Sequence, residues 1–141
     1  MNDLSWVRRA LCLSCVFLIG GGSSFGMGRS LPRHCQFDFR QTQRQRLLDG
    51  CIYEGIDLRG ANLSGAYFRN CTFRSVDATL VDLRGATFES SQIERSRLDG
   101  ASLDGTRWVK TRWCGTSELG ASWRGATFDE QTSKEDECDR E

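Results

Sequence analysis

A five-residue repeat in the placing of apolar side chains dominates the sequence between Cys51 and Glu130. When this stretch is divided into blocks of five, the first residue is small or medium-sized, and glycine recurs at the fifth. A period of five matches neither the 3.6 of a helix nor the 2.0 of a free strand, so it indicates a repeating coil. The third residue is large and apolar in fourteen of sixteen blocks, and we expect these fourteen to form the core: Tyr53, Leu58, Leu63, Phe68, Phe73, Leu83, Phe88, Ile93, Leu98, Leu103, Trp108, Trp113, Trp123 and Phe128.

If each block forms one side of a square, four blocks complete a coil, and residues twenty apart stack about 4.8 Å from one another, as in any β ladder. The sequence supports this spacing. One inner column then consists of aromatic residues only: Phe68, Phe88, Trp108 and Phe128. One outer column alternates in charge, in the manner of cross-strand pairs that fix register: Glu54, Arg74 and Glu94.

The blocks resemble those of the pentapeptide-repeat family, which centre on Ala-Asp/Asn-Leu followed by two variable residues. The block that begins at Ala61 reads Ala-Asn-Leu-Ser-Gly and matches outright, and the blocks that begin at Ala86, Ala101 and Ala126 are close relatives. The resemblance implies an all-β fold, a right-handed quadrilateral β-helix of about four coils over residues 51–130. Periodicity by itself indicates only a solenoid.

One side of the expected coil is irregular. Its inner column runs Leu58, Ala78, Leu98 and Glu118, so a small residue and then a carboxylate stand where bulk is expected. Because burying an unpaired carboxylate is costly, we expect the chain to bulge near Glu118, turning Leu119 inward and Glu118 to water. A structural defect near the end of the repeat is the favoured interpretation, and a binding feature is the alternative.

Both ends of a solenoid need a cap. Residues 27–50 are interpreted as a linker and N-terminal cap, because Gln43 falls on the inward phase and breaks the repeat. Asp38 and Gln41 have the spacing of a capping box, which predicts a short helix over about 39–48. Alternatively, the alternation of Cys35, Phe37 and Phe39 predicts a strand or plug. Residues 131–141 are rich in acids and are expected to form a flexible tail.

The first 26 residues are typical of a secretory signal peptide. Arg8 and Arg9 precede an apolar run over residues 10–20, and small residues around Gly26 suit cleavage. We therefore expect a periplasmic or secreted protein. The alternative is an uncleaved membrane anchor, although the run is shorter than the roughly 20 residues that a span needs.

The cysteines bear on the cellular compartment of the protein and on its possible disulfides. Five of the seven lie beyond the leader, so at least one thiol stays free or pairs with another chain. Cys51 and Cys71 lie one coil apart on an inner column, where a disulfide is conceivable but buried thiols are favoured. Cys114 is expected to face outward, and it could join Cys138 as a tether or act with it as a redox pair.

Charge and composition exclude several function classes. Lys and Arg balance Asp and Glu at 19 each, so no global field recruits nucleic acid or an anionic membrane. The lone histidine, His34, has no second histidine or paired carboxylate at ligand spacing, and no catalytic, metal, cofactor-binding or small-molecule motif is found. Outward acids such as Asp57 and Asp104 are read as hydrogen-bonding positions of the repeat.

The sequence therefore favours an exported, non-catalytic module that binds a protein partner or itself through its aromatic C-terminal coil, touching a membrane only if the leader stays uncleaved. The family suggests an alternative, mimicry of duplex DNA that protects DNA gyrase. The neutral charge, the short rod and the leader disfavour it. A thiol-redox protein using Cys114 and Cys138 is the third class.

Overall fold

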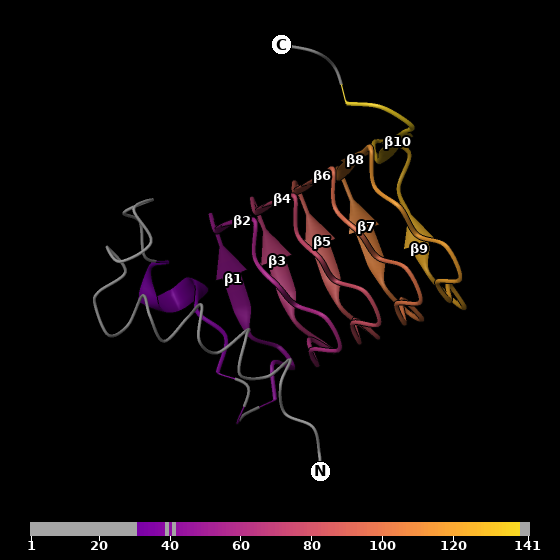
Figure 1. Cartoon of the computed structure of the whole chain (residues 1–141). Coiled ribbons are helices and arrows are strands. Elements are labelled where there is room, and N and C mark those ends of the chain that lie inside the picture. The colour runs from indigo at the N-terminus through magenta and orange to yellow at the C-terminus, as the bar shows by residue number, and fades with distance from the viewer. Residues whose placement is uncertain (1–30, 39, 41, 139–141) are drawn as a thin grey trace.

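The computed structural model describes residues 31–38, 40 and 42–138, which coil into a four-sided parallel β-solenoid (Figure 1). The elements are the 3-10 helix η2 (Arg33–Cys35) and the strands β1 (Leu47–Asp49), β2 (Ile52–Glu54), β3 (Tyr67–Arg69), β4 (Thr72–Arg74), β5 (Thr87–Glu89), β6 (Gln92–Glu94), β7 (Arg107–Val109), β8 (Arg112–Cys114), β9 (Thr127–Phe128) and β10 (Ser133–Glu135). The predicted all-β solenoid of about four coils is confirmed.

Two sides of the coil carry continuous sheets and two carry single bridges. The odd-numbered strands form one five-stranded parallel sheet in the order β1-β3-β5-β7-β9, and the even-numbered strands form the other. On the remaining sides, isolated parallel bridges join residues such as Asp57 to Asp77 and Asn62 to Asp82. From β1 to β9 every pairing has the predicted offset of twenty residues.

The fifth residue of each block makes the corner. Every fifth residue from Gln45 to Gly125 has a positive φ, whether or not it is glycine. Most of these corners are glycines because glycine adopts this left-handed backbone without a Cβ clash. Leu80 is the most demanding exception, since a branched apolar residue holds φ at 61° and leaves its side chain exposed.

The third residues pack inward as stacked rings and aliphatic chains. The rings of Phe68 and Phe88 stack at 4.8 Å, and those of Phe88 and Trp108 stack at 4.1 Å. Twelve of the fourteen expected core residues are buried, Trp123 is partly buried, and Phe128 is 52% exposed. The two outliers lie in the last coil, where no further coil covers them.

Small hydroxyl residues at the first position of a block satisfy the backbone inside the coil. Ser91 accepts a hydrogen bond from the Cys71 amide and donates to the carbonyl of Phe68, and Ser96 repeats this arrangement one block later. A buried polar group is tolerated when it is bonded in this way. These residues therefore fit an interior that is otherwise apolar.

The outward side chains form local turns and ion pairs. Asp57 and Asp82 each accept a hydrogen bond from the amide two residues on, as expected for a hydrogen-bonding position of the repeat. In the predicted charge column, Arg74 pairs with Glu54 at 3.3 Å and with Glu94 at 3.1 Å. Such exposed pairs are each worth roughly 0.2–1 kcal/mol, so they fix register more than they stabilise the fold.

The N-terminal end differs from the prediction because the coil begins before Cys51. Gln43 points inward and is 2% exposed; its amide donates to the carbonyl of Asp38, and Arg46 donates to its oxygen. The helix expected over 39–48 is wrong in its described part, because β1 occupies residues 47–49 and pairs with β3. Residues 39 and 41 lie outside the described residues. The alternative of a plug is closer, since Phe37 is buried and stacks on Tyr53 at 5.1 Å.

The C-terminal end also differs, because residues 131–138 continue the coil and are not a free tail. Strand β10 pairs with β8, but with an offset of 21 residues, since one extra residue lies in the turn after Phe128. Asp129 closes this turn by accepting bonds from the Lys110 amide and from the Thr132 hydroxyl. The hydroxyl bond is the main cause that holds the pKa of Asp129 below its ordinary value.

The bulge expected at Glu118 is wrong. The ladder continues through this block, with Leu98 donating to the carbonyl of Ser117 and Gly100 donating to that of Leu119. Leu119 is 77% exposed, whereas Glu118 takes the inward position and forms an ion pair with Lys134. A partner from the extra half-coil therefore reduces the cost that the prediction assigned to an inward carboxylate.

The predicted leader, residues 1–26, lies outside the described residues. Among the residues that are described, no helix has the length and apolarity to cross a membrane.

Candidate functional site

The open C-terminal end of the solenoid contains a recess. Its volume is about 500 Å³, and its floor is formed by the aromatic side chains of Trp113, Trp123 and Phe128. The rings contact one another, with Trp113 and Trp123 at 5.4 Å and Trp123 and Phe128 at 5.6 Å. The recess exists because Trp123 and Phe128 have no successor above them, and Trp113 is followed only by Lys134 in the ladder.

An ion pair crosses this recess. Glu118 and Lys134 come from neighbouring sides of the coil, and both occupy inward positions. The ammonium group of Lys134 lies 6.0 Å from the ring centroids of both Trp113 and Trp123, which is the range of a cation–π contact. The pair thus covers part of the aromatic floor with charge and leaves Phe128 uncovered.

Two buried polar atoms at the recess have no hydrogen-bond partner among the described residues. They are Nε1 of Trp113, a donor, and Oε2 of Glu118, an acceptor. Both residues line the recess. Unpaired buried groups are costly, so these two atoms reduce the stability of this end of the fold.

Beside the recess, a disulfide holds the last half-coil in place. Cys114 and Cys138 are bonded, with their Cα atoms 4.7 Å apart. Cys114 has the outward register expected from the sequence, yet it is only 1% exposed. This bond keeps β10, and with it Lys134, against β8.

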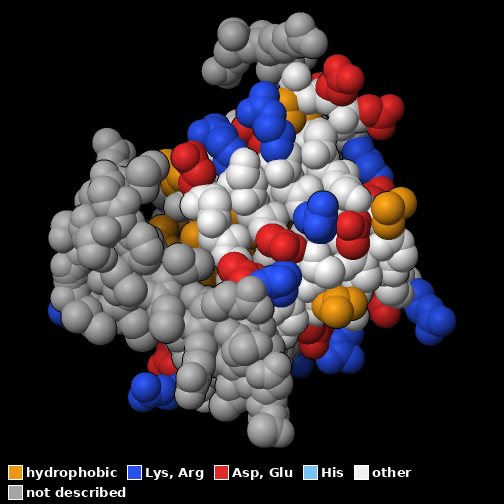
Figure 2. All heavy atoms as spheres, viewed as in Figure 1, with side chains coloured by type: hydrophobic (Ala, Val, Ile, Leu, Met, Phe, Trp, Pro, Cys, Tyr) orange, Lys and Arg blue, Asp and Glu red, His pale blue; other side chains and the backbone are white. Residues whose placement is uncertain are grey.

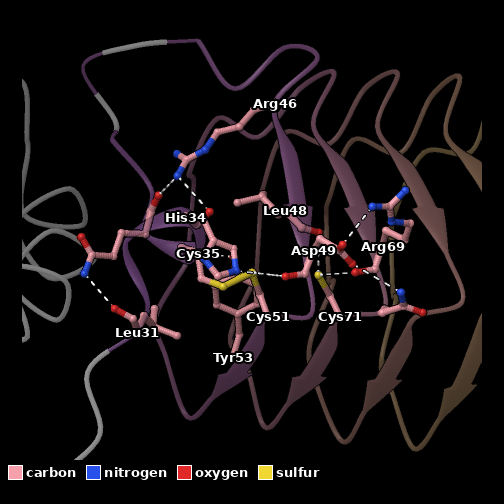
Figure 3. Close-up of a disulfide and its surroundings, with 12 residues drawn as sticks. Leu31, His34, Cys35, Arg46, Leu48, Asp49, Cys51, Tyr53, Arg69 and Cys71 are labelled. Carbon is pink, nitrogen blue, oxygen red and sulfur yellow. Dashed lines mark hydrogen bonds and ion pairs between the residues drawn. A yellow bond between two sulfur atoms is a disulfide. The ribbon is translucent and has the colours of Figure 1, made fainter.

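The second disulfide lies at the opposite end, and it corrects the free thiol favoured for Cys51 while Cys71 stays a buried thiol as expected. Cys51 is bonded to Cys35, not to Cys71, with a Cα separation of 5.5 Å (Figure 3). Cys71 keeps its thiol, donates to the carbonyl of Leu48, and is buried. Burial is the main cause that raises the pKa of this thiol. The disulfide forms with Cys35 because η2 brings that residue over the first coil, where the hydroxyl of Tyr53 donates to its carbonyl.

The outer surface carries charges of both signs in close alternation (Figure 2). Arg59 pairs with Asp57 at 2.8 Å and Arg84 pairs with Asp82 at 2.7 Å. The hydroxyl of Ser117 is the main cause that lowers the pKa of Asp99. Opposite charges in contact cancel at a distance, so the described surface in this view presents no extended face of one sign.

Sequence reasoning found the aromatic residues of the recess but missed its polar pair. Lys134 was placed in the tail, because the extra residue after Phe128 breaks the five-residue phase. A usable signal existed: an unpaired inward Glu118 implies that a cation lies within reach. The partner of Cys51 was missed for a similar reason, since Cys35 lies outside the repeat.

The fold defines the structural class of this protein, and comparisons with known proteins identify its repeat. The architecture is that of a four-sided parallel β-solenoid. The family model described as pentapeptide repeats matches residues 54–89 with eight copies, which confirms the predicted pentapeptide repeats in this stretch of the chain. No curated protein matches the sequence.

The solved structures support the same fold. A trypsin-treated variant of QnrB1, a plasmid-mediated fluoroquinolone resistance protein, superposes with a TM-score of 0.60 at 24% identity, covering 68% of this chain and 49% of QnrB1. Full-length QnrB1 gives a TM-score of 0.55 at 23% identity, covering 61% and 43%. The present chain thus spans about half the length of QnrB1, and at this identity the likeness concerns the fold alone.

Proposed function

We propose that this protein is an exported, non-catalytic interaction module that docks through the open C-terminal end of its β-helix. The observation that carries the proposal is the aromatic recess, in which Phe128 is 52% exposed and Trp123 is only partly buried. Apolar recesses with a few polar groups are preferred sites of recognition.

A second copy of the chain is the occupant that we propose. Strand β9 is the outermost strand of its sheet, so its outer edge is open to a further strand or chain. When two ends meet, the exposed parts of the rings of Trp123 and Phe128 on each copy are covered. Such a two-fold contact uses the same surface on both copies.

Export is supported by the cysteines as well as by the leader. Two disulfides join four of the five cysteines that lie beyond the predicted signal peptide. Disulfides persist mainly in oxidising compartments such as the periplasm and the extracellular space. Cell fractionation followed by N-terminal sequencing tests this part. A mature protein that begins near Met27 is expected, and a cytoplasmic protein with an intact N-terminus contradicts it.

The thiol-redox alternative is disfavoured because Cys114 is buried under the last half-coil, whereas reactive thiols are accessible. The gyrase-directed alternative is disfavoured because residues 51–130 hold ten basic and eleven acidic residues. On the face seen in Figure 2, the described charges of both signs are interspersed.

Sedimentation equilibrium of the oxidised protein tests the docking proposal. The wild type is expected to form dimers in a concentration-dependent manner, and Phe128→Ser is expected to remain monomeric. Leu119→Ser is the matched control, because Leu119 belongs to the same coil, is more exposed, and lies outside the recess. A wild-type protein that stays monomeric at high concentration refutes self-association. Equal weakening by both substitutions refutes the recess as its site.

A further inference from the structure

The N-terminal end holds a group of three metal-ligating side chains that the proposed function does not use. One ring nitrogen of His34 and the sulfur atoms of Cys35 and Cys51 all lie within 4.8 Å of one another (Figure 3). The two sulfurs are bonded in the oxidised protein. His34 is exposed, whereas both cysteines are buried against the first coil.

We propose that the reduced protein binds a zinc ion through His34, Cys35 and Cys51, so that zinc replaces the disulfide as the clamp of the N-terminal cap. Zinc prefers thiolate and imidazole ligands at about 2.3 Å and about 2.0 Å, respectively. Ligand atoms that lie within 4.8 Å of one another can surround one such ion after small movements. Water fills the fourth position, because His34 faces solvent.

The surroundings of His34 suit this role. Its Nε2 lies 3.1 Å from the carbonyl oxygen of Asp49 and donates to it. In a neutral ring that donates through Nε2, Nδ1 carries the lone pair that a metal ion needs. A backbone carbonyl that orients the ring is a usual outer partner of a metal-bound histidine. Asp49 itself is engaged by Arg69 at 2.9 Å, so its carboxylate stays out of the site.

Replacing the disulfide by a bound zinc ion begins with a two-electron reduction. A dithiol reductant gives two electrons and two protons to the bond between Cys35 and Cys51, which yields two thiols and an oxidised, disulfide-bonded reductant. Zinc then binds as both thiols lose their protons to water. Either clamp ties η2 to the first coil and keeps Phe37 stacked on Tyr53.

Cobalt titration of the reduced full chain tests the proposal, because tetrahedral Co²⁺ with thiolate ligands has distinctive absorption bands. The reference protein carries Cys12→Ser and Cys15→Ser, which leaves the described residues unchanged. We expect one Co²⁺ per chain after reduction, none before it, and displacement of Co²⁺ by Zn²⁺. Circular dichroism of the same samples is expected to retain the β-sheet signal with metal bound.

Two further variants of the reference protein distinguish this site from other thiols. His34→Ala keeps every sulfur and is expected to weaken binding at least tenfold, since even outer partners of a metal ligand cost about 10–100-fold. The double substitution of Cys114 and Cys138 by serine removes the other pair and is expected to leave binding unchanged. The proposal is overturned if the reduced reference binds no metal, if His34→Ala binds equally well, or if the double substitution abolishes binding.

Discussion

Replacing Ala78 by valine is expected to stabilise the protein, because Ala78 borders the interior void where the core is incompletely filled. The void has a volume of about 30 Å³ and is lined by apolar side chains from neighbouring columns, among them Leu58, Ile93 and Leu98. Ala78 itself is buried at 6% exposure. Its neighbours along the inner column are both leucines, so the void follows directly from the one small residue.

The expected gain in stability can be calculated from the volume of the void. A residual cavity costs about 24 cal/mol per Å³, which gives roughly 0.7 kcal/mol for this volume. Burying two additional carbon atoms contributes about 1.6 kcal/mol at about 0.8 kcal/mol each. Imperfect fit reduces the sum, because an added methyl group forces small shifts in a packed core. The expected gain in the free energy of unfolding is therefore about 1–2 kcal/mol.

Urea denaturation with both disulfides intact measures this gain. The midpoint is expected to rise by roughly 0.5–1 M, for a slope of about 2 kcal/mol per M that does not change. Ala86→Val is the matched control: Ala86 is fully buried and does not line the void, so overpacking is expected to cost about 1–3 kcal/mol. Loss of stability in Ala78→Val, to the extent seen in the control, refutes the reasoning that the void limits stability.

Three other changes test separate parts of the structure. Replacing Cys114 and Cys138 by serine opens a loop of 24 residues and is expected to cost about 3 kcal/mol in thermal or urea unfolding; an unchanged midpoint means that the bond does not form. Leu80→Gly removes a leucine with a positive φ, which relieves about 1–2 kcal/mol of backbone strain. Because this relief exceeds the entropic cost of glycine, about 0.5–1 kcal/mol, the unfolding midpoint is expected to rise. A fall in the midpoint counts against a strained backbone at this corner. The hydroxyl of Ser122 is the main cause that holds the pKa of Asp104 below its ordinary value of 3.8. The ionised carboxylate therefore stabilises the fold above pH 3.8, and this contribution to the free energy of unfolding disappears as the pH falls through the lowered pKa. Asp104→Asn is accordingly expected to lose less stability than the wild type between about pH 5 and about pH 2, and identical acid profiles contradict the assignment.

The sequence predicted the middle of the molecule well and its two ends poorly, for a physical reason. Within the repeat, each inward residue contacts its equivalents one coil away, so the column of Phe68, Phe88 and Trp108 could be read from spacing alone. At the ends there is no second coil to repeat against. Gln43 fills the first inward position with an amide whose bonding partners, Asp38 and Arg46, cannot be inferred from the period.

The C-terminal recess shows the same limit. Its aromatic floor follows from the repeat, but Lys134 reaches its inward position only because of one extra residue in the turn at Asp129. A single insertion shifts every later residue out of phase, which is why residues 131–141 were predicted to be a tail. Glu118 and Lys134 form one ion pair in the structure, but the spacing of the repeat does not show that they lie together.

The direct test of the account is whether residues twenty apart are stacked in solution. Nuclear Overhauser contacts between the ring protons of Phe68 and Phe88, and between those of Phe88 and Trp108, measure this in the full-length protein. The account predicts strong contacts for both pairs, since the ring centroids lie 4.8 Å and 4.1 Å apart. Contacts of these rings only with residues near in sequence contradict a twenty-residue coil.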